Sequence, residues 1–213
     1  MRLVSAGAAQ ALVMRQAAAK GVEVEGTFGA VGAMMEKYLA TTACDLVILA
    51  RKQIDELAAK GRVDRATIVD LGCVPTSIAV RERDVSPNVS DPDALTTALL
   101  AADAIYFPDP AKATAGIHFQ HVLERLGILD RVKGRIRNFP NGAATMRAMA
   151  EADGQPIGCT QATEIRATPG VRLVAALPQG LDLVTTYSGA VDARAADREA
   201  ARGFLAGLAG QLS

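Results

Sequence analysis

The stretch DLVILARKQIDELAAKG, residues 45–61, decides the fold class of this 213-residue chain. Residues 45–50 form a continuous apolar run of strand length, which is typical of a strand covered on both faces. A helix is expected over 53–60, and Gly61 is the residue type that ends helices. The same succession of a short β-rich run and a helical stretch recurs along the chain. This alternation predicts an α/β fold with mainly parallel strands.

The neighbouring segments repeat this pattern on both sides. Further strands are expected over 22–28, 76–83, 104–107, 156–160, 171–176 and 183–193. Further helices are expected over 31–39, 116–127, 141–152 and 200–208. Asp91, Pro92 and Asp93 form a strong helix start, because Asp caps helices, proline suits the first helical position and an acid suits the first turn.

The composition is that of a globular protein. The chain has 23 basic and 23 acidic side chains, so its formal charge is zero, and half of its residues are apolar. This hydrophobicity excludes a wholly disordered chain. The zero net charge excludes a general nucleic-acid binder, which needs a basic excess. No segment approaches the roughly 20 unbroken apolar residues that span a bilayer, so we expect no membrane insertion.

The amino terminus lacks the layout of a secretory signal. A strand-like Arg2-Leu3-Val4 leads directly into an Ala-rich helical stretch, which leaves no room for a basic region, an apolar core and a cleavage site. We therefore expect a cytoplasmic protein, or a periplasmic one if the terminus has been shortened.

The three cysteines indicate neither a metal site nor a disulfide framework. Cys44, Cys73 and Cys159 have no metal-ligand spacing, and their number is odd. Each lies beside an apolar run, so we expect three small buried hydrophobic residues. No cofactor is expected either, because the chain has no P-loop and no dinucleotide-binding fingerprint.

Small residues open a helix after a strand at four places. These are Ser5-Ala6-Gly7-Ala8, Thr27-Phe28-Gly29-Ala30, Thr114-Ala115-Gly116 and Asn141-Gly142-Ala143. Free N–H groups and the helix dipole favour an anion at such starts, and these loops gather at the carboxyl ends of strands in open sheets. Glycine at one such turn also fits plain geometry. Four of them together predict a site for a small anion.

The order of several segments resembles the molybdate-binding protein family, the type II periplasmic solute-binding proteins of molybdate ABC transporters. The segments are VSAGAAQAL (4–12), GTFGAVGAMMEKYL (26–39), FPDPAKATAGIHFQHVLERLGILDRV (107–132) and GVRLVAALPQGLDLVTTY (170–187). The resemblance implies a two-lobed α/β fold with the ligand in a cleft between the lobes. It places residues 1–80 plus 188–213 in one lobe and 81–187 in the other.

The site residues depart from this family. Its members typically hold an oxyanion with Ser hydroxyls at the first two helix starts, where this chain has Gly7, two residues after Ser5, and Ala30 or Val31. A frequent tyrosine is replaced by Thr160. The remaining donors are backbone N–H groups, at Ala8, Val31, Ala115 and Ala143. Because a tetrahedral dianion needs nearly all its oxygens satisfied, these departures favour another oxyanion or a carboxylate.

Arg51 directly follows the buried strand 45–50. At that strand end its guanidinium suits a bidentate clamp on a carboxylate ligand. A solvated arginine on the surface of the following helix fits the position equally well.

A second resemblance within the same superfamily is to the aconitate isomerases, which implies a cofactor-free isomerase of a small di- or tricarboxylate. Such an enzyme needs carboxylate clamps and one base that moves an allylic proton. Arg51 is the candidate clamp, and His118 or Glu164 is the candidate base; Glu164 also fits as a first-turn acid that suits the helix dipole. His118 and His121 lack a carboxylate at ligand spacing, so no metal is expected. A ligand-free interaction module is disfavoured by the small residues at the strand ends.

Overall fold

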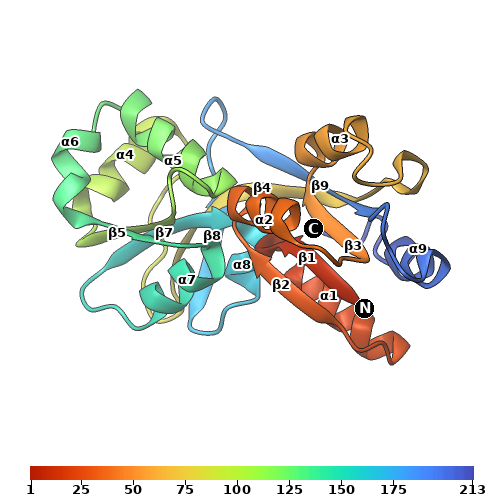
Figure 1. Cartoon of the computed structure of the whole chain (residues 1–213). Helices are drawn as coiled ribbons and strands as arrows, with labels where there is room; N and C mark the ends of the chain where they lie inside the picture. The colour runs from red at the N-terminus through yellow and green to blue at the C-terminus, as the bar shows by residue number, and fades with distance from the viewer. The chain divides into compact units, whose positions relative to one another are not determined.

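The computed structural model describes all residues, 1–213, and the chain forms two compact units (Figure 1). Unit 1 comprises Met1–Val74 and Thr185–Ser213, and unit 2 comprises Pro75–Val184. The chain leaves unit 1 inside one long strand, β4 (Val69–Arg81), and returns at the start of another, β9 (Val184–Val191). The sequence analysis placed the two boundaries between the lobes after residues 80 and 187. These positions lie six and three residues after the boundaries between the units in the structure.

The sheet of unit 1 gathers three strand ends at one edge. Strand β1 (Arg2–Ala6) pairs in parallel with β2 (Glu25–Gly29) on one side and β3 (Leu46–Ala50) on the other. Strand β9 pairs antiparallel with β3, and β4 follows β9 in the strand order. The helical elements of this unit are η1 (Gly7–Ala9), α1 (Gln10–Lys20), α2 (Val31–Ala40), α3 (Arg51–Ala59), η2 (Arg65–Thr67) and α9 (Arg198–Ala206).

Unit 2 repeats this arrangement. Strand β5 (Ala104–Pro108) lies between β6 (Ile136–Phe139) and β7 (Pro156–Gln161), and both pair with it in parallel. The second half of β4 pairs antiparallel with β7 and with β8 (Val171–Ala176). The helical elements are α4 (Pro92–Ala101), α5 (Thr114–Arg125), α6 (Leu129–Val132), η3 (Lys133–Arg135), α7 (Gly142–Ala150) and α8 (Ala162–Arg166).

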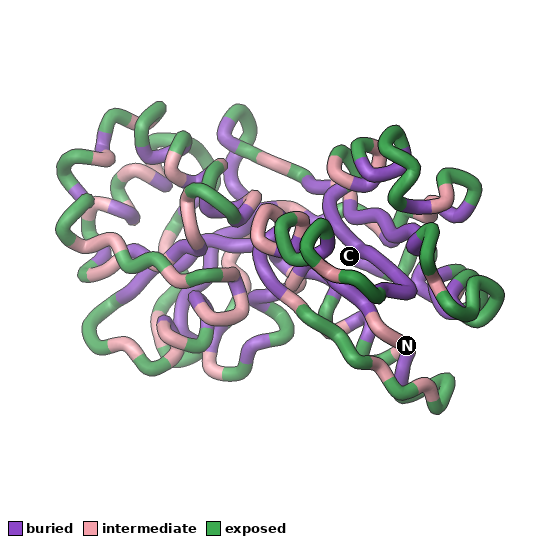
Figure 2. The backbone as a smooth tube through the Cα atoms, in the orientation of Figure 1, coloured by how far each residue is buried: buried purple, intermediate pink, exposed green.

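Burial explains why these segments became strands and helices (Figure 2). All five residues of β3 are buried, as its apolar sequence predicts. The core of unit 2 forms where α4 and α5 cover β5, with the rings of Phe107 and Phe119 edge to face at 5.4 Å between centroids. Burying an aromatic pair in this geometry stabilises the unit beyond the area that it removes from water.

The helix start at Asp91 is confirmed. The Asp91 Oδ1 accepts a hydrogen bond of 2.8 Å from the backbone N of Ala94, and Pro92 is the first residue of α4. The structure corrects one other local expectation. Strand β4 starts at Val69, seven residues before the expected position, because Gly72 and Pro75 interrupt its apolar pattern in the sequence. Strand β9 is antiparallel to β3, and β4 is antiparallel to β7 and β8, so the sheet is mixed. The pairs within β1, β2 and β3 and within β5, β6 and β7 are parallel, in agreement with the expected predominance of parallel strands.

The cysteines differ in their surroundings. Cys44 and Cys159 are buried, as expected, but Cys73 is exposed on β4, and its Sγ lies 3.4 Å from the Thr186 Oγ1. The expectation of three buried cysteines is therefore wrong for Cys73, because its strand presents this position to solvent. None of the helices combines the length and hydropathy needed to cross a bilayer.

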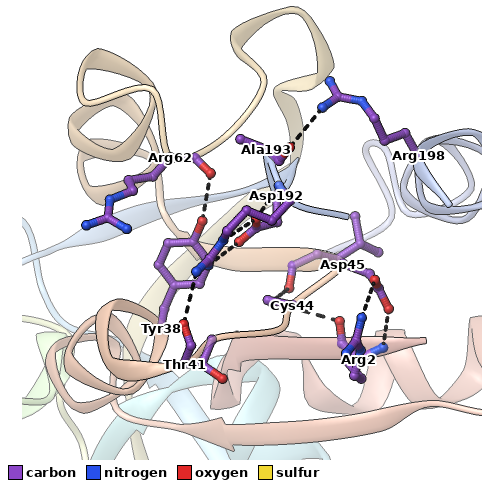
Figure 3. A network of polar contacts seen from close by, with 11 residues as sticks. Arg2, Tyr38, Thr41, Cys44, Asp45, Arg62, Asp192, Ala193 and Arg198 are labelled. Carbon is purple, nitrogen blue, oxygen red and sulfur yellow. Dashed lines mark hydrogen bonds and ion pairs between the residues drawn. The ribbon is translucent and has the colours of Figure 1, made fainter. Parts of the chain in front are cut away.

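A buried polar network lies at the opposite ends of the unit 1 strands, where β3 begins and β9 ends (Figure 3). The Asp192 side chain is fully buried and accepts from the Arg194 Nε at 2.9 Å and Nη2 at 2.8 Å. The Tyr38 hydroxyl donates to the Arg62 carbonyl at 2.9 Å, and the Arg194 guanidinium lies over the Tyr38 ring. These contacts join α2 to the end of β9.

Candidate functional site

The helices that follow the parallel strands of unit 1 begin without a side-chain cap. Alanine precedes η1, α2 and α3, at Ala6, Ala30 and Ala50, and none of these helices has a side-chain cap hydrogen bond. In contrast, α9 begins after Asp197, whose Oδ1 accepts from the backbone N of Ala200 at 2.9 Å. The first N–H groups of an uncapped helix have no intrahelical acceptor, so an anion is a suitable partner.

Strand register brings several predicted ligand residues of unit 1 together. Ser5 lies opposite Phe28 of β2 and Ile48 of β3, and Ala6 lies opposite Gly29. The helix starts at Gly7 and Val31 therefore share one edge. The Ser5 hydroxyl is fully buried and donates to the Ala6 carbonyl at 3.0 Å, so its proton is used inside the fold. Thr27 is exposed on β2.

Arg51 is the first residue of α3, at the strand end where the sequence placed it. Its Nε donates to both carboxylate oxygens of Asp55, at 3.0 and 3.1 Å, and its Nη1 donates to the Asp70 Oδ1 at 2.9 Å. The Ser188 hydroxyl also donates to this oxygen, at 2.6 Å. Arg51 and its two carboxylates together carry one net negative charge. The two carboxylates therefore largely cancel the attraction of the Arg51 guanidinium for a further anion.

The start of α5 is held against the end of β5 in unit 2. Ala113 precedes the helix and provides no side-chain cap. A side chain on Gly116 would place its Cβ 2.2 Å from the Pro108 carbonyl oxygen and 2.5 Å from that of Asp109. Only glycine permits this approach of helix to strand end. The predicted residues Thr114, Ala115 and Gly116 thus form an uncapped helix start at a fixed position.

The start of α7 has a different arrangement, which sequence analysis missed. The Asn141 Oδ1 accepts from the backbone N of Ala144 at 2.9 Å. The backbone N–H groups of Gly142 and Ala143 hydrogen-bond to the buried carboxylate of Glu164. The Thr160 hydroxyl donates to the Glu164 Oε2 at 2.7 Å. A resident side chain therefore uses the donors that were predicted to hold a ligand.

The environment of Glu164 changes its proton affinity. Burial raises the pKa of its carboxyl, and the hydrogen bonds from Thr160 and the backbone reduce this rise without cancelling it. The sequence signal for this contact is a glutamate in the first turn of α8, four residues after a threonine at a strand end. This signal indicates a helix acid but does not identify the second helix that the carboxylate contacts.

The histidines are placed on α5 with different surroundings. The His118 Nε2 lies 2.7 Å from the Leu181 carbonyl oxygen and is half-buried, whereas His121 is exposed. His118 therefore joins α5 to the segment between β8 and β9. No group of three or more His, Cys, Asp or Glu side chains that could hold a metal ion is present.

Comparisons with known proteins agree with this architecture. Residues 3–211 match the family described as bacterial extracellular solute-binding protein. Over 169 residues the chain is 32% identical to the aconitate isomerase of Pseudomonas sp, covering 78% of this chain and 62% of that protein. Over 174 residues it is 25% identical to the molybdate-binding protein ModA of Escherichia coli strain K12, covering 81% of this chain and 67% of that protein. The chain thus spans less than two thirds of the isomerase.

The fold has solved counterparts. The periplasmic molybdate-binding protein of Azotobacter vinelandii superposes with a TM-score of 0.74 at 18% identity, covering 98% of this chain and 92% of that one. This likeness confirms the predicted fold class, the two-lobed α/β fold of type II periplasmic binding proteins.

Proposed function

Because the chain belongs to the bacterial extracellular solute-binding protein family, we propose that it binds a small anion, an oxyanion or a carboxylate, at uncapped helix starts. The observation that carries this proposal is the alanine before η1, α2, α3 and α5. Each of these elements follows a parallel strand and has no side-chain acceptor for its first N–H groups. An anion supplies the missing acceptor and interacts favourably with the helix dipole.

The ligand donors in this proposal are mainly backbone groups. In unit 1 they are the N–H groups around Gly7 and Ala8 and those from Gly29 to Val31, and in unit 2 they are those from Thr114 to Gly116. The compensated charge of Arg51 gives it a minor part in holding an inorganic oxyanion. The anions named for the relatives, molybdate and aconitate, represent the two candidate ligand classes of this proposal, an oxyanion and a carboxylate.

We expect the preferred anion to stabilise the protein strongly. A ligand at one hundred times its dissociation constant adds about 2.7 kcal/mol to the free energy of unfolding. For a chain of this size, that raises the melting temperature by roughly 5–10 °C. Thermal unfolding with molybdate, sulfate, citrate, cis-aconitate and trans-aconitate checks this, with sodium chloride at matched ionic strength as the control. Equal melting temperatures in all solutions would contradict the proposal.

A variant that caps α5 sharpens this test. Ala113→Asp introduces the cap found at α4, and Ala113→Asn introduces a neutral one. Both occupy the donors that the ligand would use, so anion affinity falls at least tenfold. Ala101→Asp, at the exposed end of α4, controls for the added charge and leaves affinity nearly unchanged. Unaltered affinity in both capped variants would exclude α5 from the site.

The relative at 32% identity favours a second candidate function, a cofactor-free isomerase of a di- or tricarboxylate. In this candidate function, the Glu164 carboxylate takes an allylic C–H proton, the double bond shifts, and the proton returns to the far carbon. Proton NMR of trans-aconitate with the protein in deuterium oxide tests this step. Deuterium uptake at the allylic carbon, lost in Glu164→Gln, is the expected result for an isomerase. An unchanged spectrum excludes aconitate as its substrate.

A further inference from the structure

One buried carboxylate of unit 2 is bound at the start of a helix in the way that a free anion would be. We name as the Glu164 seat the group formed by Glu164, Thr160, Gly142 and Ala143. Glu164 is only 8% exposed, and it accepts from the Thr160 hydroxyl at 2.7 Å and from the backbone N–H groups of Gly142 and Ala143. A carboxylate at the start of a helix, satisfied by backbone and hydroxyl donors, has the chemistry of a bound anion.

The fit of this seat depends on glycine. A Cβ on Gly142 would lie 1.9 Å from the Glu164 Oε2 and 2.2 Å from the Thr160 Oγ1. The carboxylate and the hydroxyl therefore fill the space that any side chain at position 142 would need. Asn141 takes the next donor, the N–H of Ala144, at 2.9 Å. The three donors at the start of α7 are thus all used within the protein.

The neighbouring helix start in the same sheet differs in this respect. Strand β5 pairs in parallel with both β6 and β7, so α5, α7 and α8 all begin at the same edge of the unit 2 sheet. Helix α5 has no side-chain cap, whereas α7 has both its cap and the Glu164 carboxylate. An anion bound at the start of α5 therefore finds the donors at the start of α7 already used, and a carboxylate lies at the same edge of the sheet.

We propose that Glu164 sets the charge selectivity of the anion site, favouring singly charged carboxylates over tetrahedral dianions. This inference rests on the proposed anion-binding function. A dianion needs more hydrogen-bond donors than a carboxylate and is repelled more strongly by a fixed negative charge. The Glu164 seat both withdraws donors and adds that charge.

Two variants of the full chain test this role. Glu164→Gln keeps the shape of the side chain but removes its charge, and Glu151→Gln makes the same change at the exposed end of α7. Calorimetric titrations use molybdate and acetate at fixed ionic strength. We expect Glu164→Gln to raise molybdate affinity at least tenfold and to change acetate affinity less than threefold, and Glu151→Gln to change neither.

The outcomes separate this inference from the function on which it rests. If the wild type binds an anion and Glu164→Gln leaves the molybdate-to-acetate affinity ratio unchanged, the selectivity role is overturned and the anion-binding function stands. If neither the wild type nor any variant binds an anion, the proposed function fails, and this inference fails with it.

Glu164→Ala provides a second measurement that does not depend on binding at α5. It vacates the Glu164 seat, so added formate should restore the lost melting temperature in a saturable way. The wild type and Glu151→Ala should lack this dependence. A formate response equal in all three proteins would show that the seat does not hold an anion and would overturn the inference.

Discussion

Replacing Asp192 by Ala is expected to lower the free energy of unfolding by about 3 kcal/mol, the lower end of the range for breaking a buried ion pair. The Asp192 side chain is fully buried, and its carboxylate accepts from the Arg194 side chain and from the Arg194 backbone N, the latter at 2.7 Å. Arg194 is 38% exposed and can turn partly to water, which limits the loss. Denaturant unfolding measures the change.

The pH dependence of this effect follows from the pKa of Asp192. Burial alone would raise this pKa, but the hydrogen bonds from the Arg194 side chain and backbone outweigh this effect and hold the pKa below its ordinary value. The contribution of Asp192 is therefore complete above the unfolded pKa of about 3.9 and is lost as the pH falls through the lower folded value. The difference between wild type and Asp192→Ala should be constant from pH 6 to 8 and shrink in acid.

Asp130→Ala is the matched control, because Asp130 is 94% exposed and pairs only with an exposed lysine. It should leave the unfolding curve unchanged. Equal stability of Asp192→Ala and Asp130→Ala would show that the network of Figure 3 does not stabilise unit 1.

Gly116→Ala is expected to have the second large effect. The added methyl would lie 2.2 Å from the Pro108 carbonyl oxygen, which belongs to the central strand of the unit 2 parallel ladder and cannot move freely. Overpacking of this kind costs about 3 kcal/mol. Relief of the clash moves the start of α5, so anion affinity should fall at least tenfold as well. Denaturant unfolding and calorimetric titration measure the two losses.

Gly203→Ala is the control for this substitution. Gly203 lies inside α9, and a Cβ there has no atom within 4 Å. Alanine in a helix is more favourable than glycine by about 0.5–1 kcal/mol, so this variant should be slightly more stable and bind anions normally. A Gly116→Ala protein with wild-type stability and affinity would contradict the close packing of α5 on β5.

The fold was predictable where local pattern and tertiary structure agree. The buried strand β3, strand β8 over 171–176 and the Asp91 cap follow from runs of a few residues. The length of strand β4 was underestimated because Gly72 and Pro75 break its apolar pattern. In the structure, pairing with strands distant in the chain keeps the segment extended. Strand β2 starts three residues late because it is an edge strand, and its first residues are exposed.

The candidate site was predictable only in part. The small residues at the strand ends were visible in the sequence, since each helix start is a local motif. The Glu164 carboxylate and the Gly142 amide are distant in the chain, and strand pairing alone brings them together. The same is true of Asp70 beside Arg51. Contacts of this kind decide which donors are free for a ligand, and no local pattern encodes them.

The crossing points of the chain also set an order of assembly. Unit 2 is one continuous segment, whereas the unit 1 sheet needs β9, which lies between β3 and β4 in the strand order. During synthesis, all of Pro75–Val184 emerges before β9 does. Domains generally fold as units as they leave the ribosome, so unit 1 is the last to be completed. Until β9 has been synthesised, strand β3 has no partner on one side and is an exposed edge strand. Nascent chains truncated before residue 185 would therefore be prone to aggregation.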